Sequence, residues 1–220
     1  TTYADMLGEA NLSSDEFKEF MHGIQLGSER LRRLVEDFIL LVELQTGEAN
    51  QSFEMRRERL TDMTLVISLV LERLRSKAEA RRVSLVEDIA GPLPTILADR
   101  AFLVDALSRL VDNAIKFSGK DGGLVTVKAR PGGRGMIIEV IDRGIGIPTP
   151  EQSKIFDLFY QIDRAKMEQQ GSGSGLAIAR GIIRLHGGEL TCQSRVNTGS
   201  TFTIDLPIRR TGSLAPQPSP

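Results

Sequence analysis

Three residues within little more than one helical turn have side chains that together could bind a nucleoside triphosphate. Asn113, Lys116 and Phe117 fall on one face of the helix that apolar spacing predicts for residues 99–117. An amide oxygen can join a Mg²⁺ shell that phosphates and water complete, an ammonium can offset phosphate charge, and a ring can pack on a base. An ordinary helix with a solvated polar face has the same pattern, so these residues alone do not decide.

Two glycine-rich segments could bring their backbone close to a ligand. Residues 142–148 follow an apolar strand, and Asp142 could accept a hydrogen bond from an exocyclic amine such as that of adenine. Residues 171–176 open a predicted helix, whose first N–H groups favour phosphate. The first segment is equally typical of a tight turn, and the second of a flexible linker. A Rossmann fingerprint is excluded, because polar residues 164–170 stand where that motif needs a strand.

The elements that must position these segments are alternating strands and helices. Strands are predicted for residues 53–60, 83–89, 95–98, 124–129, 136–142, 189–194 and 201–207, and helices for residues 61–81, 99–117 and 174–185. Asp99 is expected to cap the second of these helices. The irregular stretch that ends at Gly173 is long for a compact domain, which predicts a functional lid.

An amphipathic helix precedes this framework. Apolar residues recur at alternating spacings of four and three from Phe17 to Val42, the pattern of a seam for a partner helix. Further apolar positions beside the seam favour a four-helix bundle. The predicted organisation is a truncated dimerisation helical hairpin over residues 1–46, a linker over 47–52, a second domain over 53–209 and a disordered tail over 210–220.

Composition excludes several functional classes. Hydrophobic residues make up 40% of the chain, charged residues 26%, and the formal net charge is −1, so no basic field attracts nucleic acid or an anionic membrane. The longest apolar runs are too short to cross a bilayer. Cys192 is the only cysteine, which excludes an internal disulfide and a multi-cysteine metal site. We expect a cytoplasmic location, with membrane attachment of the full-length protein left open.

The order of the motifs resembles that of sensor histidine kinases. Residues 110–118 are similar to the asparagine box, 142–148 to the first glycine box, 156–159 to the phenylalanine box, 171–176 to the second glycine box and 199–202 to the closing motif. The resemblance extends over residues 14–207. It implies the α+β two-layer sandwich of the gyrase, Hsp90, histidine kinase and MutL (GHKL) ATPases, a mixed sheet backed by helices, here preceded by an all-α helical hairpin.

The resemblance also implies the ligands, ATP and Mg²⁺, and the residues that bind them. By position, Asn113 would hold Mg²⁺ and Lys116 would approach the phosphates, both with a catalytic role, while Asp142 would read the adenine amino group. The other expected nucleotide-binding residues are Phe117 near the adenine, Gly144, Gly146 and Ile147 around the base, Gly171, Gly173, Gly175 and Leu176 at the phosphate end of a lid over residues 148–174, and Thr201 under the base. Phe156 and Phe159 would either anchor the lid or pack in the core.

The implied activity is that of an ATP-dependent protein-histidine kinase. The γ-phosphoryl group of ATP would pass to an imidazole on the dimerisation helix and then to an aspartate of a response regulator receiver domain. We expect the acceptor histidine upstream of Thr1, because neither His22 nor His186 has the family's surroundings. The chain is therefore expected to be unable to autophosphorylate. A homodimer through the helical segment is expected, with no nucleic acid and no membrane contact by this part.

Three other functions stay open at this stage. An ATP-hydrolysing GHKL clamp would need a base, but the place that holds a glutamate in the related hydrolytic ATPases is Arg109, and a guanidinium cannot act as one. A degenerate kinase serving as a binding scaffold would not bind the nucleotide. An anti-sigma-factor serine kinase shares the pocket but does not need the long helix.

Overall fold

The structure is a computed structural model that describes residues 14–119, 122–162 and 173–208. It divides the chain into two compact units, Thr1–Leu40 and Leu41–Pro220. The described part of the first unit is a helix, α2 (Ser14–Thr46), whose last turns belong to the second unit. The helix predicted from the apolar seam is therefore confirmed. Side chains of that seam, including Phe17, Leu31 and Phe38, are exposed in the single chain.

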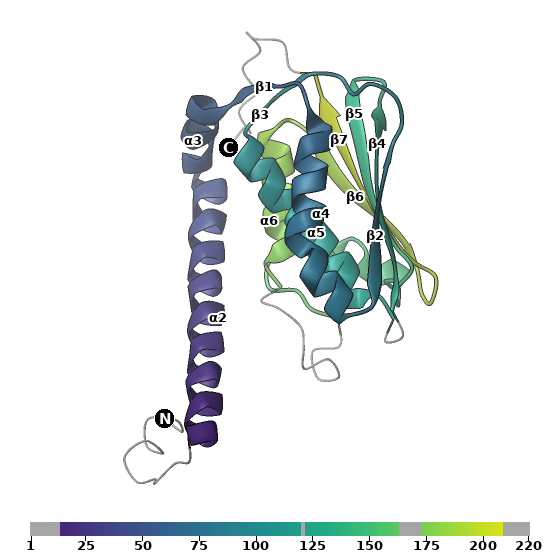
Figure 1. Ribbon diagram of the computed structural model, residues 1–220. Helices are drawn as coiled ribbons and strands as arrows, with labels where there is room; N and C mark the ends of the chain where they lie inside the picture. Colours follow the sequence, from purple (N-terminus) through teal and green to yellow (C-terminus); the bar gives the residue numbers. More distant parts are fainter. Residues whose placement is uncertain (1–13, 120–121, 163–172, 209–220) are drawn as a thin grey trace. The chain divides into compact units, whose positions relative to one another are not determined.

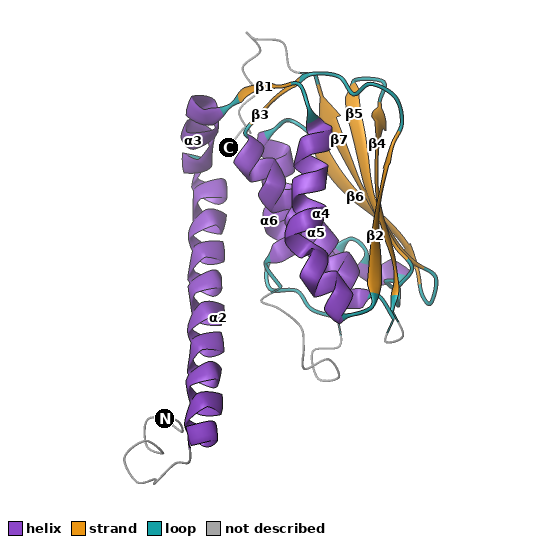
Figure 2. Ribbon diagram, viewed as in Figure 1, coloured by secondary structure: helices purple, strands orange, loops and turns teal. Residues whose placement is uncertain are grey.

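The second unit is built around a mixed five-stranded sheet with the strand order β2-β4-β5-β7-β6. Its strands are β2 (Val83–Ile89), β4 (Gly123–Pro131), β5 (Gly135–Asp142), β6 (Glu189–Arg195) and β7 (Gly199–Pro207). The β2–β4 pair is parallel, and the other pairs are antiparallel. Three helices, α4 (Met63–Ala80), α5 (Arg100–Phe117) and α6 (Gly175–Leu185), cover one face of the sheet (Figures 1 and 2). The two-layer sandwich predicted from the sequence is confirmed.

Alternation along the central strands puts apolar side chains between the sheet and the helices. On β5, Met136, Ile138 and Val140 are fully buried, while the residues between them are partly exposed. Helix α5 contributes the matching stripe, which includes Leu107 and Leu110. Burying one such side chain stabilises the fold by about 1.5–3 kcal/mol, so this interface holds the helices to the sheet. Among the described residues, the structure has no helix long and apolar enough to span a membrane.

Helix α5, which carries the predicted phosphate-binding residues, is fixed at its first turn by Asp99. The Asp99 carboxylate accepts hydrogen bonds from the backbone N–H groups of Ala101 and Phe102 at 2.9 and 3.2 Å, which confirms the predicted cap. Its other oxygen accepts from Arg56 Nε at 2.8 Å. The Asp99 backbone N–H donates to Nε2 of buried His186 at 3.1 Å, which ties α5 to the end of α6.

The prediction of a strand over residues 53–60 is wrong for its first half. Residues Glu48–Arg56 form the helix α3, and the strand β1 is limited to Glu58–Leu60, paired antiparallel with β3 (Ile96–Ala98). Residues 48–52 of the predicted linker over 47–52 are helical, and the break between the two helices is Gly47, whose φ of 85° lies in the left-handed region. Helix forms beyond it because Ala49 and Phe53, one turn apart, are both buried. The first helix of the predicted hairpin and the tail lie outside the described residues.

We expect Phe53→Ala to lower the free energy of unfolding of the second unit by about 3–5 kcal/mol. The Phe53 ring is 1% exposed and stacks edge-on against the His186 ring, with 4.8 Å between the centroids. Urea unfolding followed by circular dichroism measures the change. Met55→Ala is the matched control, because Met55 lies on the same helix and is 79% exposed. Equal effects of the two substitutions would contradict this packing.

Candidate functional site

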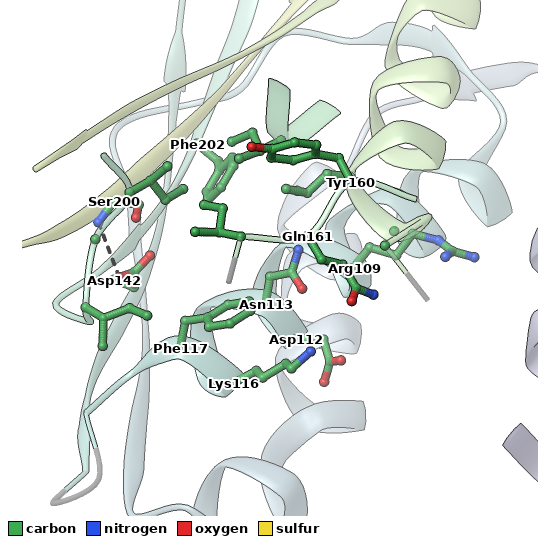
Figure 3. Close-up of a pocket in the computed structure, with 18 of the residues that line it drawn as sticks. Arg109, Asp112, Asn113, Lys116, Phe117, Asp142, Tyr160, Gln161, Ser200 and Phe202 are labelled. Carbon is green, nitrogen blue, oxygen red and sulfur yellow. Dashed lines mark hydrogen bonds between the residues drawn. The ribbon is translucent and has the colours of Figure 1, made fainter. Parts of the chain in front are cut away.

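A cavity of about 280 Å³ lies where the C-terminal half of α5, the loop after β5 and the first turn of α6 meet (Figure 3). Of the predicted nucleotide-binding residues, it is lined by Asn113, Lys116, Phe117, Asp142, Gly146, Ile147, Gly173, Gly175 and Leu176. These residues come from segments far apart in the sequence. The sandwich thus brings both glycine boxes and the asparagine box to one place, which is what binding of a single ligand requires.

Asn113, Lys116 and Phe117 lie on the face of α5 that the cavity exposes, while Ala114 and Ile115 face the core. The Lys116 ammonium lies 5.0 Å from the centroid of the Phe117 ring. Burial lowers the pKa of Lys116 below its usual value, and the nearby cations Lys77 and Arg81 act in the same direction, against Asp112. A partly desolvated ammonium attracts an anion more strongly than one in open water does. This end of the cavity is therefore suited to phosphate.

At the other end, the last residue of β5 contributes a buried carboxylate. Asp142 is 6% exposed, and its Oδ1 accepts hydrogen bonds from the backbone N–H groups of Gly144 at 2.8 Å and Ser200 at 3.2 Å. Burial raises the pKa of Asp142, while the hydrogen bonds from Gly144 and Ser200 oppose this shift. An ionised carboxylate has about four acceptor positions, so capacity remains for an amino group in the cavity.

Both glycines of the first glycine box are needed because protein backbone presses against them. A Cβ on Gly144 would stand 2.1 Å from the carbonyl oxygen of Phe117, and a Cβ on Gly146 would stand 2.1 Å from that of Arg195. Gly146 also has a φ of 68°, which a side chain rarely adopts. Gly146 lines the cavity as predicted, but Gly144 does not. Gly144 instead lets this loop pack against the end of α5.

The β6–β7 hairpin holds the first glycine box from the other side. The Ser194 hydroxyl accepts from the backbone N–H of Ile147 at 2.8 Å and donates to the carbonyl of Gly199 at the same distance. The Gln152 side chain donates to the carbonyls of Ile147 at 3.0 Å and Ser194 at 2.7 Å. Sequence reasoning missed Ser194 and Gln152, and no local pattern marks them, because their partners lie more than forty residues away or on an irregular loop.

The second glycine box is fixed to the phenylalanine box by its backbone. The Phe159 N–H donates to the Gly173 carbonyl at 3.2 Å, and a Cβ on Gly173 would stand within 3.0 Å of Phe159 atoms. Phe156 is buried and its ring meets that of Phe202 edge-on, so it packs in the core, whereas Phe159 is 60% exposed. Gly171 and most of the predicted lid lie outside the described residues.

The structure does not bring Thr201 to the cavity. Its neighbours Ser200 and Phe202 line the cavity instead, because side chains alternate between the two faces of β7 and Thr201 falls on the opposite face.

The Cys192 thiol lies on the inner face of β6, where the register pairs Cys192 with Phe202 of β7. Burial, together with the charge of Asp142, raises its pKa to about 12, so it stays a neutral thiol near physiological pH.

Several further cavity residues were not predicted as ligands. Arg109, which stands where the related hydrolytic ATPases hold a glutamate, lines the cavity, and its Nε donates to the Asp105 carboxylate at 3.0 Å. The others are Asp112, Ile145, Pro148, Ile155, Tyr160, Gln161 and Ile162, besides Ser200 and Phe202. Most are apolar residues of the loop after β5, whose position depends on tertiary packing that a sequence pattern does not reveal.

The family profile described as histidine kinase-, DNA gyrase B-, and HSP90-like ATPase matches residues 98–210. The chain therefore belongs to this family of ATPases. The match begins in β3 and includes both described ends of the cavity, the asparagine box on α5 and the carboxylate at the end of β5. Membership identifies ATP as the nucleotide that such a domain uses.

Relatives narrow the class to sensor histidine kinases, which confirms the resemblance seen in the motifs. The sensor-like histidine kinase SenX3 of Mycobacterium tuberculosis is 34% identical over 209 residues, covering 92% of this chain and 49% of SenX3. The chain thus spans about half the length of that relative. The mycobacterial sensor histidine kinase MprB is 30% identical, with a TM-score of 0.60, over 70% of this chain and 98% of MprB. The Acinetobacter baumannii histidine kinase AdeS, 22% identical, shares the fold with a TM-score of 0.69 over 91% of this chain and 88% of AdeS.

We expect Asp142→Asn to weaken adenine nucleotide binding by at least about tenfold. The carboxylate would accept a hydrogen bond from the adenine amino group, whereas the amide of Asn has only one acceptor oxygen and can present an N–H donor to that amino group. Titration calorimetry measures the affinity, and thermal unfolding should show an intact domain. Asp205→Asn is the control, because Asp205 lies toward the far end of β7 and does not line this cavity. Unchanged affinity in Asp142→Asn would contradict the assigned role.

The raised pKa of Asp142 also predicts a pH effect. Protonation turns the carboxylate into a weaker acceptor that also carries an O–H donor, and burial raises the pKa of Asp142 above the ordinary value of 3.8. As the pH falls, the original chain should therefore begin to lose nucleotide affinity at a higher pH than it would if Asp142 had the pKa of an exposed aspartate. The ratio of affinities between the original chain and Asp142→Asn removes the titration of the nucleotide itself. A ratio that stays constant down to the onset of acid unfolding would refute this assignment.

Proposed function

We propose that this chain is the ATP-binding kinase part of a sensor histidine kinase. It binds ATP with Mg²⁺ and transfers the γ-phosphoryl group to a histidine on a dimerisation helix, for relay to an aspartate of a response regulator. The observation that carries the proposal is the single cavity with a buried carboxylate, Asp142, at one end and Lys116 with the first turn of α6 at the other. Such a cavity offers a base site and a phosphate site at once.

Each end of the cavity recognises a different part of the nucleotide. Asp142 accepts a hydrogen bond from the adenine amino group, and the Phe117 ring packs beside the base. Lys116 and the N–H groups at the start of α6, near Gly175, meet the phosphates, since a helix N-terminus favours anions. Leu176 and Ile147 give the cavity apolar walls that exclude water. Catalysis then rests on positioning and charge rather than on covalent participation of the protein.

The described residues fit a magnesium ion that is held mainly through the nucleotide. They include no group of three or more His, Cys, Asp or Glu side chains that could cage a metal. Asn113 places an amide in the cavity and would supply a protein oxygen ligand, with phosphate and water oxygens completing the shell, as Mg²⁺ prefers. When bound, the ion supplies charge stabilisation at the phosphates.

Phosphoryl transfer is favoured over hydrolysis by the residue one turn before Asn113. Arg109 lines the cavity there, and its guanidinium, held by Asp105, cannot take a proton from water. A clamp that hydrolyses ATP efficiently would need a carboxylate at this place.

The exposed apolar seam of α2 supports a homodimer through that helix, with a receiver domain as the second partner. We infer a cytoplasmic location for this part of the protein.

We expect the chain to phosphorylate, in trans, a longer form of the same protein that carries the acceptor histidine and is inactivated by Asn113→Ala. Radiolabelled ATP should label the longer form, and the same Asn113→Ala change in the chain should reduce this by at least about a hundredfold, because the metal-bound triphosphate would lose its protein ligand. Asn50→Ala, an exposed amide on α3, is the matched control. No transfer from a chain that binds ATP would contradict the proposal, and label on the chain itself would contradict the expected place of the acceptor histidine.

A further inference from the structure

A carboxylate stands at the phosphate end of the cavity, where a polyanion should be repelled. Asp112 lines the cavity beside Asn113, and Figure 3 shows it on the side of Lys116, away from Asp142. Its charge acts on Lys116, raising the pKa of that ammonium against the effect of burial. An uncompensated negative charge here would weaken binding of a triphosphate, because like charges repel more strongly at a partly desolvated site.

The compensating charge comes from the neighbouring helix α4. Lys77 forms an ion pair with the Asp112 carboxylate through its Nζ. One turn later, directly after the last residue of α4, Arg81 donates from Nη1 to the backbone carbonyl of Lys116 at 2.8 Å. The two residues thus join α4 to the end of α5 at successive turns, and both add positive charge around Lys116. Helix α4 contributes no residue to the cavity wall, so Lys77 acts there through Asp112.

We propose that Lys77 is a positioning residue for the phosphates: by pairing with Asp112 it removes the negative charge that would otherwise oppose a triphosphate at this end of the cavity. This inference rests on the proposed function. It makes the selectivity of the site depend on ligand charge, since Coulomb energy grows with the charge of the bound group. Lys77 should therefore matter most for ATP, less for ADP and least for adenosine, and salt should reduce its effect.

A purely structural brace between α4 and α5 makes a different prediction. If the Lys77–Asp112 pair served only to hold the helices together, its loss would lower the stability of the domain and weaken ATP and adenosine binding alike. A positioning role instead separates ligands by charge. It also predicts that removing the Asp112 carboxylate restores the ATP affinity that is lost with Lys77, because the unpaired carboxylate causes the repulsion.

The test measures binding of ATP, ADP and adenosine by titration calorimetry, with Mg²⁺ present throughout, at low and high salt. Lys77→Ala should weaken ATP binding by about three- to tenfold while adenosine binding changes by less than about twofold. Lys77→Arg should retain the original affinity, and Lys77→Ala with Asp112→Asn should recover it. The matched control is Lys128→Ala, because Lys128 forms an ion pair between β4 and β2 with Asp88 at 2.9 Å, away from the cavity.

Equal losses for ATP and adenosine, or no recovery in the double variant, would overturn the positioning role. Unchanged ATP affinity in Lys77→Ala would overturn it too, while leaving the proposed function intact. Failure of the original chain to bind any adenine nucleotide would overturn both. Thermal unfolding of each variant shows whether a loss of affinity comes with a loss of stability. The Lys77→Arg variant and the double variant then distinguish a loss of charge compensation from a loss of stability.

Discussion

The buried carboxylate of Asp142 is the interaction on which the geometry of the site depends. It lies at the end of β5 and accepts hydrogen bonds from two backbone N–H groups. One belongs to Gly144, in the loop that follows, and the other to Ser200, at the start of the neighbouring strand β7. One oxygen atom of Asp142 thereby holds both its own loop and a residue that lies 58 positions further along the sequence. Those hydrogen bonds offset part of the cost of burying the charge, which would otherwise favour the neutral acid.

The rest of the end that is proposed to hold the base follows from this anchor. The first glycine box leaves β5, packs on the Phe117 carbonyl at the end of α5 and then on the Arg195 carbonyl at the end of β6. Each contact is closer than a side chain would permit, so glycine is required by the fold itself. The ligand-facing surface is thus a consequence of how the loop is held between α5 and the β6–β7 hairpin.

The end of the cavity that is proposed to hold the phosphates is built on a different physical basis. It relies on charges at the ends of long side chains, Lys116 and Arg109, and on the start of α6, rather than on buried hydrogen bonds. Charges of this kind are compensated by neighbours: Asp105 holds Arg109, and Lys77 holds Asp112. A base site held by buried hydrogen bonds, beside one built from charged side chains, suits a ligand whose base stays in place while its terminal phosphate leaves.

The sequence predicted those features that depend on local pattern. The helix over residues 99–117, its Asp99 cap and the strands over 124–129 and 136–142 follow from periodicity and turn residues, and the order of the motifs indicates the family. Phe53 was misassigned because its helix is stabilised by packing on His186, which lies more than 130 residues away. Thr201 was expected from the family resemblance alone, whereas the alternation of side chains along β7 turns Ser200 and Phe202 toward the cavity. The Lys77–Asp112 pair joins two helices and has no local signal.

The most direct measurement is a crystal structure of the chain with Mg²⁺ and a non-hydrolysable ATP analogue. The adenine should lie against Asp142 and Phe117, with the phosphates between Lys116 and the first turn of α6 and the metal beside Asn113. An analogue bound elsewhere, or one whose base and phosphates occupy the opposite ends of this cavity, would contradict the account.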